Sequence, residues 1–256
     1  MNYKLLVDTA VLAGEIMLVS GAETYRVEDT ICRILKTSGL ETCEGFVVST
    51  GIVVTLSDSS IDAITQVKRV GERSTNLGRI YRANDISRRL CNHEISESEA
   101  YEQLKALKKE NNYKEMTLFI CIILTSVSFS VLLGASWLEC LIAGFNGLFV
   151  VASEIIYAKI RFNRFVMNLC VSFIIAVTTM AFTKYLPFTI DMEPVIVGSI
   201  MALLPGVAIT NAIRDTLQGD YMSGGAKVIE AFLIASSLAV GIGGGLAFGR
   251  IIMGGV

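Results

Sequence analysis

The chain has 256 residues, of which 52% are hydrophobic, and its mean hydropathy is +0.57. Such an apolar composition excludes an ordinary water-soluble protein, and a net charge of only −2 gives no reason to expect nucleic acid as a partner. Residues 1–115 hold 15 of the 22 Lys and Arg, whereas residues 116–256 hold all three prolines and 15 of the 22 glycines. We therefore predict an α-helical polytopic membrane protein, with an N-terminal α+β cytoplasmic domain over 1–115 and a transmembrane domain over 116–256.

The first 40 residues have apolar side chains at helical spacing on both sides of Gly21. The first stripe predicts an amphipathic helix, and the second predicts a helix that ends near Gly39. Asp8 and Glu15 interrupt the first apolar run, so we expect no cleavable signal peptide. The two stripes consist of Leu5, Leu12, Ile16 and Val19, and of Val27, Ile31, Ile34 and Leu35.

Short β-branched runs at 46–49, 52–56 and 63–67 then predict a hairpin and a third strand. Residues 75–91 are expected to form a basic helix, which we interpret as solvated or facing a membrane because the domain as a whole is not basic. Ser96 begins a capped helix in which Tyr101, Leu104 and Leu107 form the buried stripe.

Five apolar runs of about 20 residues each follow, which is the length that a bilayer core requires. Basic residues in the flanks divide nine to two, which predicts a cytoplasmic N-terminal domain and an external C-terminus. The spans are expected at about 116–135, 138–158, 165–183, 194–213 and 228–249. The nine are Lys105, Lys108, Lys109, Lys114, Lys159, Arg161, Arg164, Arg214 and Lys227, and the two are Lys184 and Arg250.

Gly241, Gly245 and Gly249 in the last span form a ridge of small residues, which predicts close approach of a neighbouring helix. The six cysteines form no C-x-x-C pair and are expected to be reduced and buried. With His93 as the only histidine, we expect no metal site, and no cofactor motif is present.

The run from 198 to 230 carries the main candidate site. Pro205-Gly206 breaks an apolar span and should leave the Met201 carbonyl without its helical partner. Four polar residues then share one helical face, namely Asn211, Arg214, Asp215 and Gln218. Broken helices near charged groups are a recurring device of transporters, although Pro205 could simply kink a helix whose charged end is wet.

Two strings in this chain resemble the signatures of the threonine/serine exporter family. One is LLPG…TNAIRD…GD…SG followed by KVIEA, and the other is SGAETYRVED at residues 20–29. The resemblance implies a secondary exporter of small polar metabolites, threonine and serine in the type members, driven by the proton gradient. Full-length members have about twice as many spans, so the chain resembles the short form, which is one subunit of a split transporter.

The resemblance also gives roles to particular residues. It implies substrate binding or transport at Pro205, Gly206, Thr210, Asn211, Arg214, Asp215 and Asp220. The candidates for proton coupling are Asp215, Asp220, Glu154 and Glu230, since carboxylates within or beside spans are expensive. Glu154 and Glu230 could instead reach the nearer interface, and Gly21, Arg26 and Glu28 form the cytoplasmic motif, whose charges could be a solvated face.

The expected partners are the lipid bilayer of the cell inner membrane, a small-molecule substrate and a second small hydrophobic membrane subunit of the same family. Relatives of the short form make succinate or another dicarboxylate an alternative substrate. A membrane-anchored regulatory subunit that does not transport is another alternative. An enzyme is not expected, because neither G-x-S-x-G nor H-E-x-x-H nor a P-loop occurs.

Overall fold

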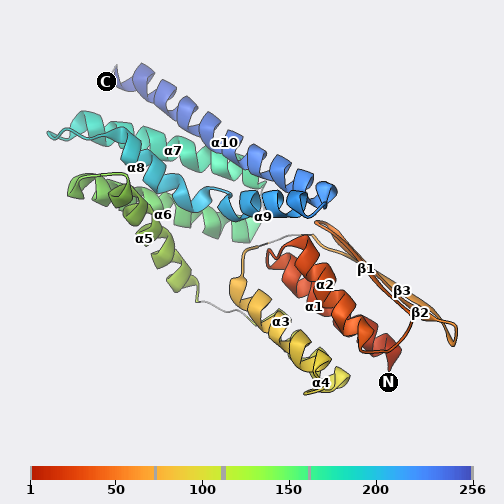
Figure 1. The fold of residues 1–256 in the computed structure, drawn as a ribbon. Coiled ribbons are helices and arrows are strands. Elements are labelled where there is room, and N and C mark those ends of the chain that lie inside the picture. Colours follow the sequence, from red (N-terminus) through yellow and green to blue (C-terminus); the bar gives the residue numbers. More distant parts are fainter. Residues whose placement is uncertain (1, 72–73, 111–113, 161–162, 255–256) are drawn as a thin grey trace. The chain divides into compact units, whose positions relative to one another are not determined.

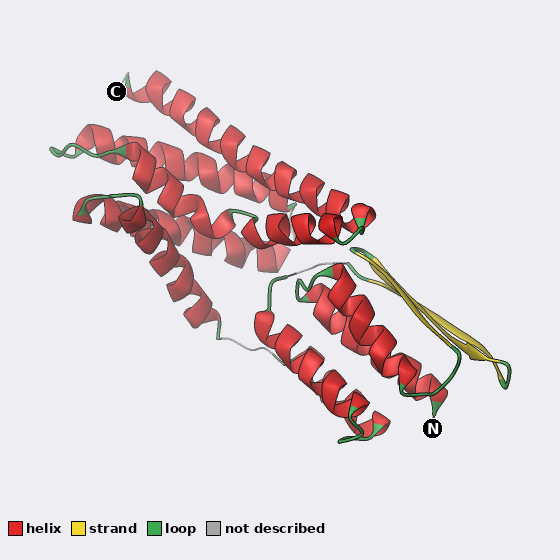
Figure 2. Cartoon of the chain, in the orientation of Figure 1, coloured by secondary structure: helices red, strands yellow, loops and turns green. Residues whose placement is uncertain are grey.

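A computed structural model describes residues 2–71, 74–110, 114–160 and 163–254, so Arg161 lies outside the described residues. The chain divides into two compact units, and Figure 1 labels their elements. The first unit is Met1–Asn112 with Gly206–Ile229, and the second is Tyr113–Pro205 with Glu230–Val256. Helices dominate the described residues, and the strands belong to one sheet (Figure 2).

The first unit begins with α1 (Tyr3–Val19) and α2 (Thr24–Lys36). Three antiparallel strands follow in the order β1-β2-β3, with bounds Thr42–Val48, Gly51–Asp58 and Ile61–Arg69. The chain continues with α3 (Leu77–Cys91) and α4 (Glu97–Lys109). Helices α1 and α2 pack on one another, on the sheet and on the α3–α4 pair, so they form the middle layer of an α+β unit.

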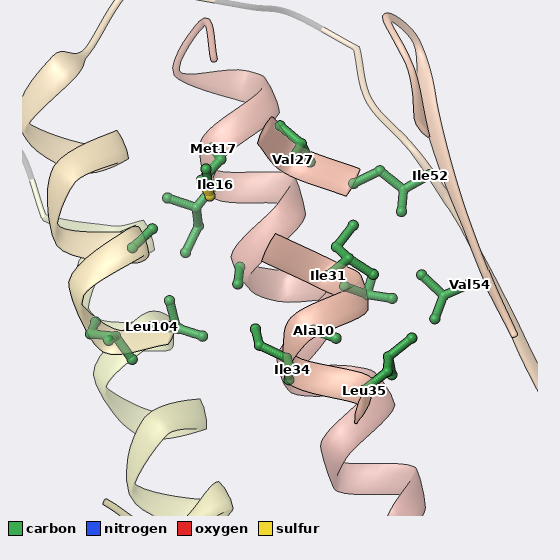
Figure 3. Packing of buried hydrophobic residues seen from close by; sticks show 14 of the residues in the cluster. Ala10, Ile16, Met17, Val27, Ile31, Ile34, Leu35, Ile52, Val54 and Leu104 are labelled. Atoms are coloured by element: carbon green, nitrogen blue, oxygen red, sulfur yellow. The ribbon is translucent and has the colours of Figure 1, made fainter. Parts of the chain in front are cut away.

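The core of this unit confirms the predicted stripe of α2, in which Val27, Ile31, Ile34 and Leu35 are fully buried. Figure 3 shows Ile52 and Val54 of β2 on one side of these helices and Leu104 of α4 on the other. The expected amphipathic character of the first helix is wrong. Helix α1 lies between layers and buries residues on most of its circumference, whereas Leu5, Leu12 and Val19 are only partly buried.

The predicted hairpin and third strand are confirmed. Val48 pairs with Gly51 at the turn between β1 and β2, and Val53 pairs with Val67 between β2 and β3. The capped start at Ser96 is also confirmed, because the Ser96 hydroxyl accepts a hydrogen bond from the Glu99 N–H at 3.2 Å. The basic helix forms as α3, although Leu77 at its start is exposed.

The second unit contains α5 (Glu115–Leu132), α6 (Trp137–Ile160), α7 (Arg164–Tyr185), α8 (Met192–Ile200) and the 3-10 turn η1 (Met201–Leu203). Helix α9 (Gly206–Leu217) belongs to the first unit, and α10 (Tyr221–Met253) belongs to both. Within the described residues, four helices are long and apolar enough to cross a membrane. The number is five if the bent pair formed by α8–η1 and α9 is one span.

The break at Pro205 forms as predicted, but the Met201 carbonyl keeps a partner. It accepts a hydrogen bond from the Leu204 N–H at 3.3 Å, because η1 replaces the last α-helical turn with tighter bonding. The carbonyl thus loses its α-helical partner, as expected, and the 3-10 bond replaces it. The predicted last span also changes, since α10 begins at Tyr221 and not near residue 228.

The glycine ridge is confirmed within the second unit. A Cβ at Gly241 would lie 2.0 Å from Ser172 Oγ and 2.4 Å from the Leu169 carbonyl oxygen. The same holds at Gly245, whose Cβ would lie 2.6 Å from the Phe173 carbonyl oxygen. Helix α10 therefore approaches α7 to a distance that only glycine allows.

The described cysteines form no disulfide, but the prediction that they are buried is wrong. Cys121 on α5 and Cys170 on α7 are exposed in the isolated chain, and the other four are partly buried. The two exposed thiols lie on helices whose outward faces are apolar, where a weakly polar side chain is tolerated.

Candidate functional site

The polar stripe of α9 divides into residues that are buried and residues that are not. Asn211 and Asp215 are buried, and the side chain of Asp215 is fully inaccessible. Arg214 exposes 54% of its side chain, and Gln218 is exposed. One face of α9 therefore presents an amide and a carboxylate to the first unit, with the guanidinium at the edge of the contact.

Asp215 is bound by three donors. Its Oδ1 accepts from the Thr24 N–H at 3.1 Å, and its Oδ2 accepts from the Thr24 hydroxyl at 3.0 Å. The ammonium of Lys227 on α10, itself buried, lies 2.6 Å from the same Oδ2. These three donors converge on one buried carboxylate, which stands at the centre of the site.

The position of Asp215 also completes helix α2. Glu23 is the N-cap residue of α2, but its side chain makes no capping hydrogen bond, and the N–H of Thr24 needs an acceptor. Asp215 supplies it from 191 residues away. A carboxylate at a helix N-terminus is favoured both by the hydrogen bond and by the helix dipole.

Two further contacts join α9 to the segment that precedes α2. The Asn211 side-chain amide donates to the Gly21 carbonyl oxygen at 2.8 Å, and Arg214 donates to the Glu23 carboxylate. Gly21 has a φ of +87°, a left-handed conformation that a residue with a Cβ rarely adopts. The two strings that resemble family signatures thus meet at this site.

The start of α10 is bound to the sheet of the same unit. The Ser223 hydroxyl accepts a hydrogen bond from the Ser49 N–H at 3.2 Å, in the turn between β1 and β2. Glu28 of α2 accepts from the Val47 N–H at 3.3 Å nearby. Helix α9 and the first turns of α10 are therefore held by both α2 and the β1–β2 hairpin.

Three carboxyl groups around Asp215 have shifted pKa values. Burial raises the pKa of Asp220, and the charge of Asp215 raises it further against the opposing effect of Lys227. Burial likewise raises the pKa of Glu28, with Asp220 and Glu44 as additional negative neighbours. Burial also acts on Glu23, but its own backbone N–H, Arg214 and Arg26 outweigh it and lower its pKa.

The remaining predicted site residues make other contacts. Thr210 is exposed and donates to the Gly206 carbonyl oxygen of its own helix. Pro205 lies between η1 and α9, directly before the first residue of α9. Arg26 is exposed and pairs with Glu23 at 3.2 Å. In the second unit, Glu154 pairs with Arg164 at 3.5 Å.

Glu230 is exposed and stands at the first position of α10 that belongs to the second unit. The cluster around Asp215 draws only on the first unit, so neither Glu154 nor Glu230 is brought into it.

Sequence reasoning missed Thr24, Lys227 and the cap role of Asp215. Thr24 stands inside the N-terminal string and Lys227 lies one to two helical turns into α10, so both were visible, but nothing local pairs them with Asp215. Glu139 was also missed. It is buried in the second unit and accepts hydrogen bonds from the N–H groups of Ser136 and Asp191. Within the described ranges, no three His, Cys, Asp or Glu side chains are grouped to hold a metal ion.

The apolar helices and the α+β unit define a multi-pass helical membrane protein, and the charged cluster lies on α9, the helix that follows the break at Pro205. A family model described as "Putative threonine/serine exporter" matches residues 8–249. The chain therefore belongs to this family of transporters, named ThrE. No solved structure matches the chain significantly.

Three curated relatives match the chain. One is "Probable threonine/serine exporter" of Mycobacterium tuberculosis, 22% identical over 93% of this chain and 45% of the relative. The chain thus spans less than half the length of that protein. The others are named "Probable succinate transporter subunit YjjP". The Klebsiella aerogenes protein is 21% identical over 88% of this chain and 87% of its own length, and the Escherichia coli protein is 22% identical over 90% and 89%.

Proposed function

We propose that this chain is one subunit of a proton-coupled secondary exporter of small polar metabolites, with threonine and serine as substrates. The observation that carries the proposal is the cluster of Asn211, Arg214 and Asp215 on α9, shortly after the break at Pro205. A break of this kind at membrane depth is tolerated where protein or a wet cavity surrounds it. Membership of a transporter family supports the same conclusion.

The guanidinium of Arg214 is the group we assign to the substrate carboxylate. It is half exposed, and among the residues that the structure describes it pairs only with the carboxylate of Glu23, so a substrate could exchange with that partner. Guanidinium binds carboxylates with two parallel hydrogen bonds, which gives geometric as well as electrostatic selectivity. Pro205, Gly206 and Thr210 would shape the path beside it.

Proton coupling is best assigned to Asp220, with Asp215 as its electrostatic partner. The contacts of Asp215 all favour its charge, whereas burial and the charge of Asp215 raise the pKa of Asp220. A carboxyl group whose pKa responds to a neighbouring buried ion pair can gain and lose a proton as that pair opens. Glu154 and Glu230 are the remaining candidates, in the second unit.

We further propose that the transporter is completed by a second small hydrophobic membrane subunit. The chain covers 45% of the mycobacterial relative but 87% and 89% of two relatives that are named as subunits. The nine-to-two division of basic residues supports an N-terminal domain in the cytoplasm and a C-terminus outside the cell inner membrane.

Succinate export is the second candidate function, because both relatives of matching length are named succinate transporter subunits. Arg214 would bind either substrate, since each offers a carboxylate. A subunit that only anchors a regulatory domain is the third candidate, and it predicts no effect of Arg214 on transport beyond assembly.

The test is export of labelled threonine, serine and succinate from cells that express the chain with and without the second subunit. Arg214→Gln should reduce export at least ten-fold without lowering abundance, because its side chain is half exposed. Gln218→Ala is the matched control, an exposed polar residue directly after the end of the same helix and outside the cluster. Unchanged export in Arg214→Gln would reject the site, and no export of any of the three would reject the proposed substrates.

A further inference from the structure

A polar cavity lies in the first unit, and none of the residues that line it belongs to the Asp215 cluster. It has a volume of about 180 Å³ and opens between α2 and α3. Asp29 and Arg33 of α2 line one wall, and Ser87, Arg88 and Cys91 of α3 line the other. Pockets for drug-sized ligands span about 300–1,000 Å³. The volume therefore suits a small metabolite and excludes a nucleotide.

The charges of the cavity define the chemistry of its ligand. Arg33 Nε donates to Asp29 Oδ2 at 2.7 Å, and no other partner engages this guanidinium among the described residues. The Arg88 guanidinium makes no hydrogen bond or ion pair with any residue that the structure describes. Two arginines and one carboxylate thus line the cavity, together with the buried Ser87.

We propose that this cavity binds a free carboxylate of a small metabolite, with Arg88 as the principal cation and Arg33 as the second. Guanidinium pairs with a carboxylate through two parallel hydrogen bonds, a geometry that a single ammonium cannot provide. A metabolite that also carries an ammonium group finds Asp29 on the opposite wall. A dicarboxylate instead uses both arginines.

Helix α2 connects this cavity to the candidate transport site. Its N-terminal residue Thr24 is bound by Asp215, and Asp29 and Arg33 follow five and nine residues later. At about 1.5 Å per residue, Asp29 lies roughly 8 Å and Arg33 roughly 14 Å from Thr24 along the helix. A ligand that draws Arg33 away from Asp29 acts on the same helix whose end holds α9. If the bound metabolite is the transported one, the cavity acts as a sensor of that solute. This part of the proposal rests on the proposed function.

Cys91 supplies a local test, because its thiol lines the cavity. The purified full-length chain in detergent is treated with a maleimide, and alkylation of each cysteine is followed by peptide mass spectrometry. Threonine, serine or succinate at millimolar concentration should slow alkylation of Cys91 at least three-fold. Cys43 is the internal control, since it is also partly buried but does not line the cavity. Its rate should not change.

The variants separate a carboxylate site from a general effect of the solute. Arg88→Gln should abolish protection, whereas Lys36→Gln, an exposed cation of α2 outside the cavity, should keep it. Asp29→Asn should remove protection by the amino acids alone. Succinamide, which keeps the size of succinate without its charges, should not protect. The proposal would be overturned if none of the three metabolites changed the rate of Cys91 alkylation. Full protection in Arg88→Gln would overturn it as well.

This readout does not depend on transport. Arg214→Gln should keep the protection of Cys91 while it loses export. Protection without export of any tested metabolite therefore supports the cavity and rejects the proposed function. Export without protection does the reverse.

Discussion

The two units of this chain place polar and apolar side chains in opposite ways. In the first unit, Ile31 and Leu104 are fully buried, and most charged side chains are exposed. In the second unit, only 11% of the apolar window of α5 is buried, and large apolar residues such as Leu132 and Ile160 face outward. The interior of that unit is rich in small polar residues, among them Ser126, Ser130, Asn146, Ser172 and Thr179.

This contrast shows that the two units are built for different solvents. Water drives apolar side chains into the core of the first unit. Lipid gives no such drive, so helices associate through close packing and interhelical hydrogen bonds. The Ser130 hydroxyl donates to the Pro194 carbonyl oxygen at 3.0 Å, and the Asn146 amide donates to the Thr179 hydroxyl at 2.9 Å. In the second unit, hydrogen bonds between polar groups of neighbouring helices stabilise the packing. Buried apolar side chains such as Leu104 do so in the first.

The largest expected effect on stability comes from the buried ion pair of Asp215 and Lys227. Neither apolar burial nor helix packing explains this pair. Asp215→Asn leaves Lys227 buried without a counter-charge, so it should destabilise the first unit by about 3–5 kcal/mol. Thermal unfolding in detergent measures this loss. The sequence alone does not indicate this loss, because only the structure places Lys227 beside Asp215.

The double variant Asp215→Asn with Lys227→Met is the matched control for this change. It removes both charges, so it should recover most of the stability without recovering export. A single variant as stable as the wild type would mean that the pair is not buried.

The next largest difference is expected when a leucine is truncated in each unit, because the two substitutions should cost different amounts of stability. Leu104→Ala in the first unit should cost about 2–5 kcal/mol, because it leaves a cavity in a fully buried core. Leu141→Ala on α6 removes a side chain that is 62% exposed, so it should change stability by no more than about 0.5 kcal/mol. Limited proteolysis of each variant reports the loss. Equal losses would show that the outer face of α6 is covered by another protein subunit.

Small residues should matter more than leucines in the second unit. Gly241→Ala places a methyl group against the Leu169 carbonyl oxygen and should cost about 1–3 kcal/mol by overpacking. Gly243→Ala is the control, because its Cβ would meet open space. Size-exclusion chromatography after heating compares the two. The comparison between units fails if both variants behave alike.

The smallest expected effect is a dependence of stability on pH in the first unit. The raised pKa values of Glu28 and Asp220 mean that the folded state binds their protons more tightly. Stability should therefore rise as pH falls from neutral towards about 4.3, the ordinary glutamate pKa. Below that value the lowered pKa of Glu23 acts in the opposite sense, and its contribution is lost.

Glu28→Gln isolates this effect, since it should flatten the rise between neutral pH and about 4.3. Melting temperatures across this range give the measurement. A steeper rise in the variant would assign the dependence to a different carboxylate.

Much of the fold followed from local patterns. The stripe from Val27 to Leu35, the hairpin at Ser49-Thr50 and the cap at Ser96 depend on residues within a few positions of one another. Helix α1 was misread because it contacts two layers at once, and its burial depends on elements that follow it in the chain. The break in the fourth span was also predicted locally, because Pro205 and Gly206 mark it in the sequence.

The candidate site was only half visible in the sequence. Spacing placed Asn211, Arg214 and Asp215 on one helical face, and resemblance singled out the segment from Ser20 to Asp29. Their meeting, through hydrogen bonds that span 190 and 191 residues, could not be read from either segment.

The sequence by itself determined where apolar helices, strands and breaks occur, because each depends on the period of neighbouring side chains. Only the tertiary structure decided which groups pair. Asp215 stabilises the N-terminus of α2 and the charge of Lys227 at once because folding brings three distant segments within hydrogen-bonding distance. Electrostatic pairing acts through space and not along the chain, so a buried carboxylate acquires its role only when its partners are in place.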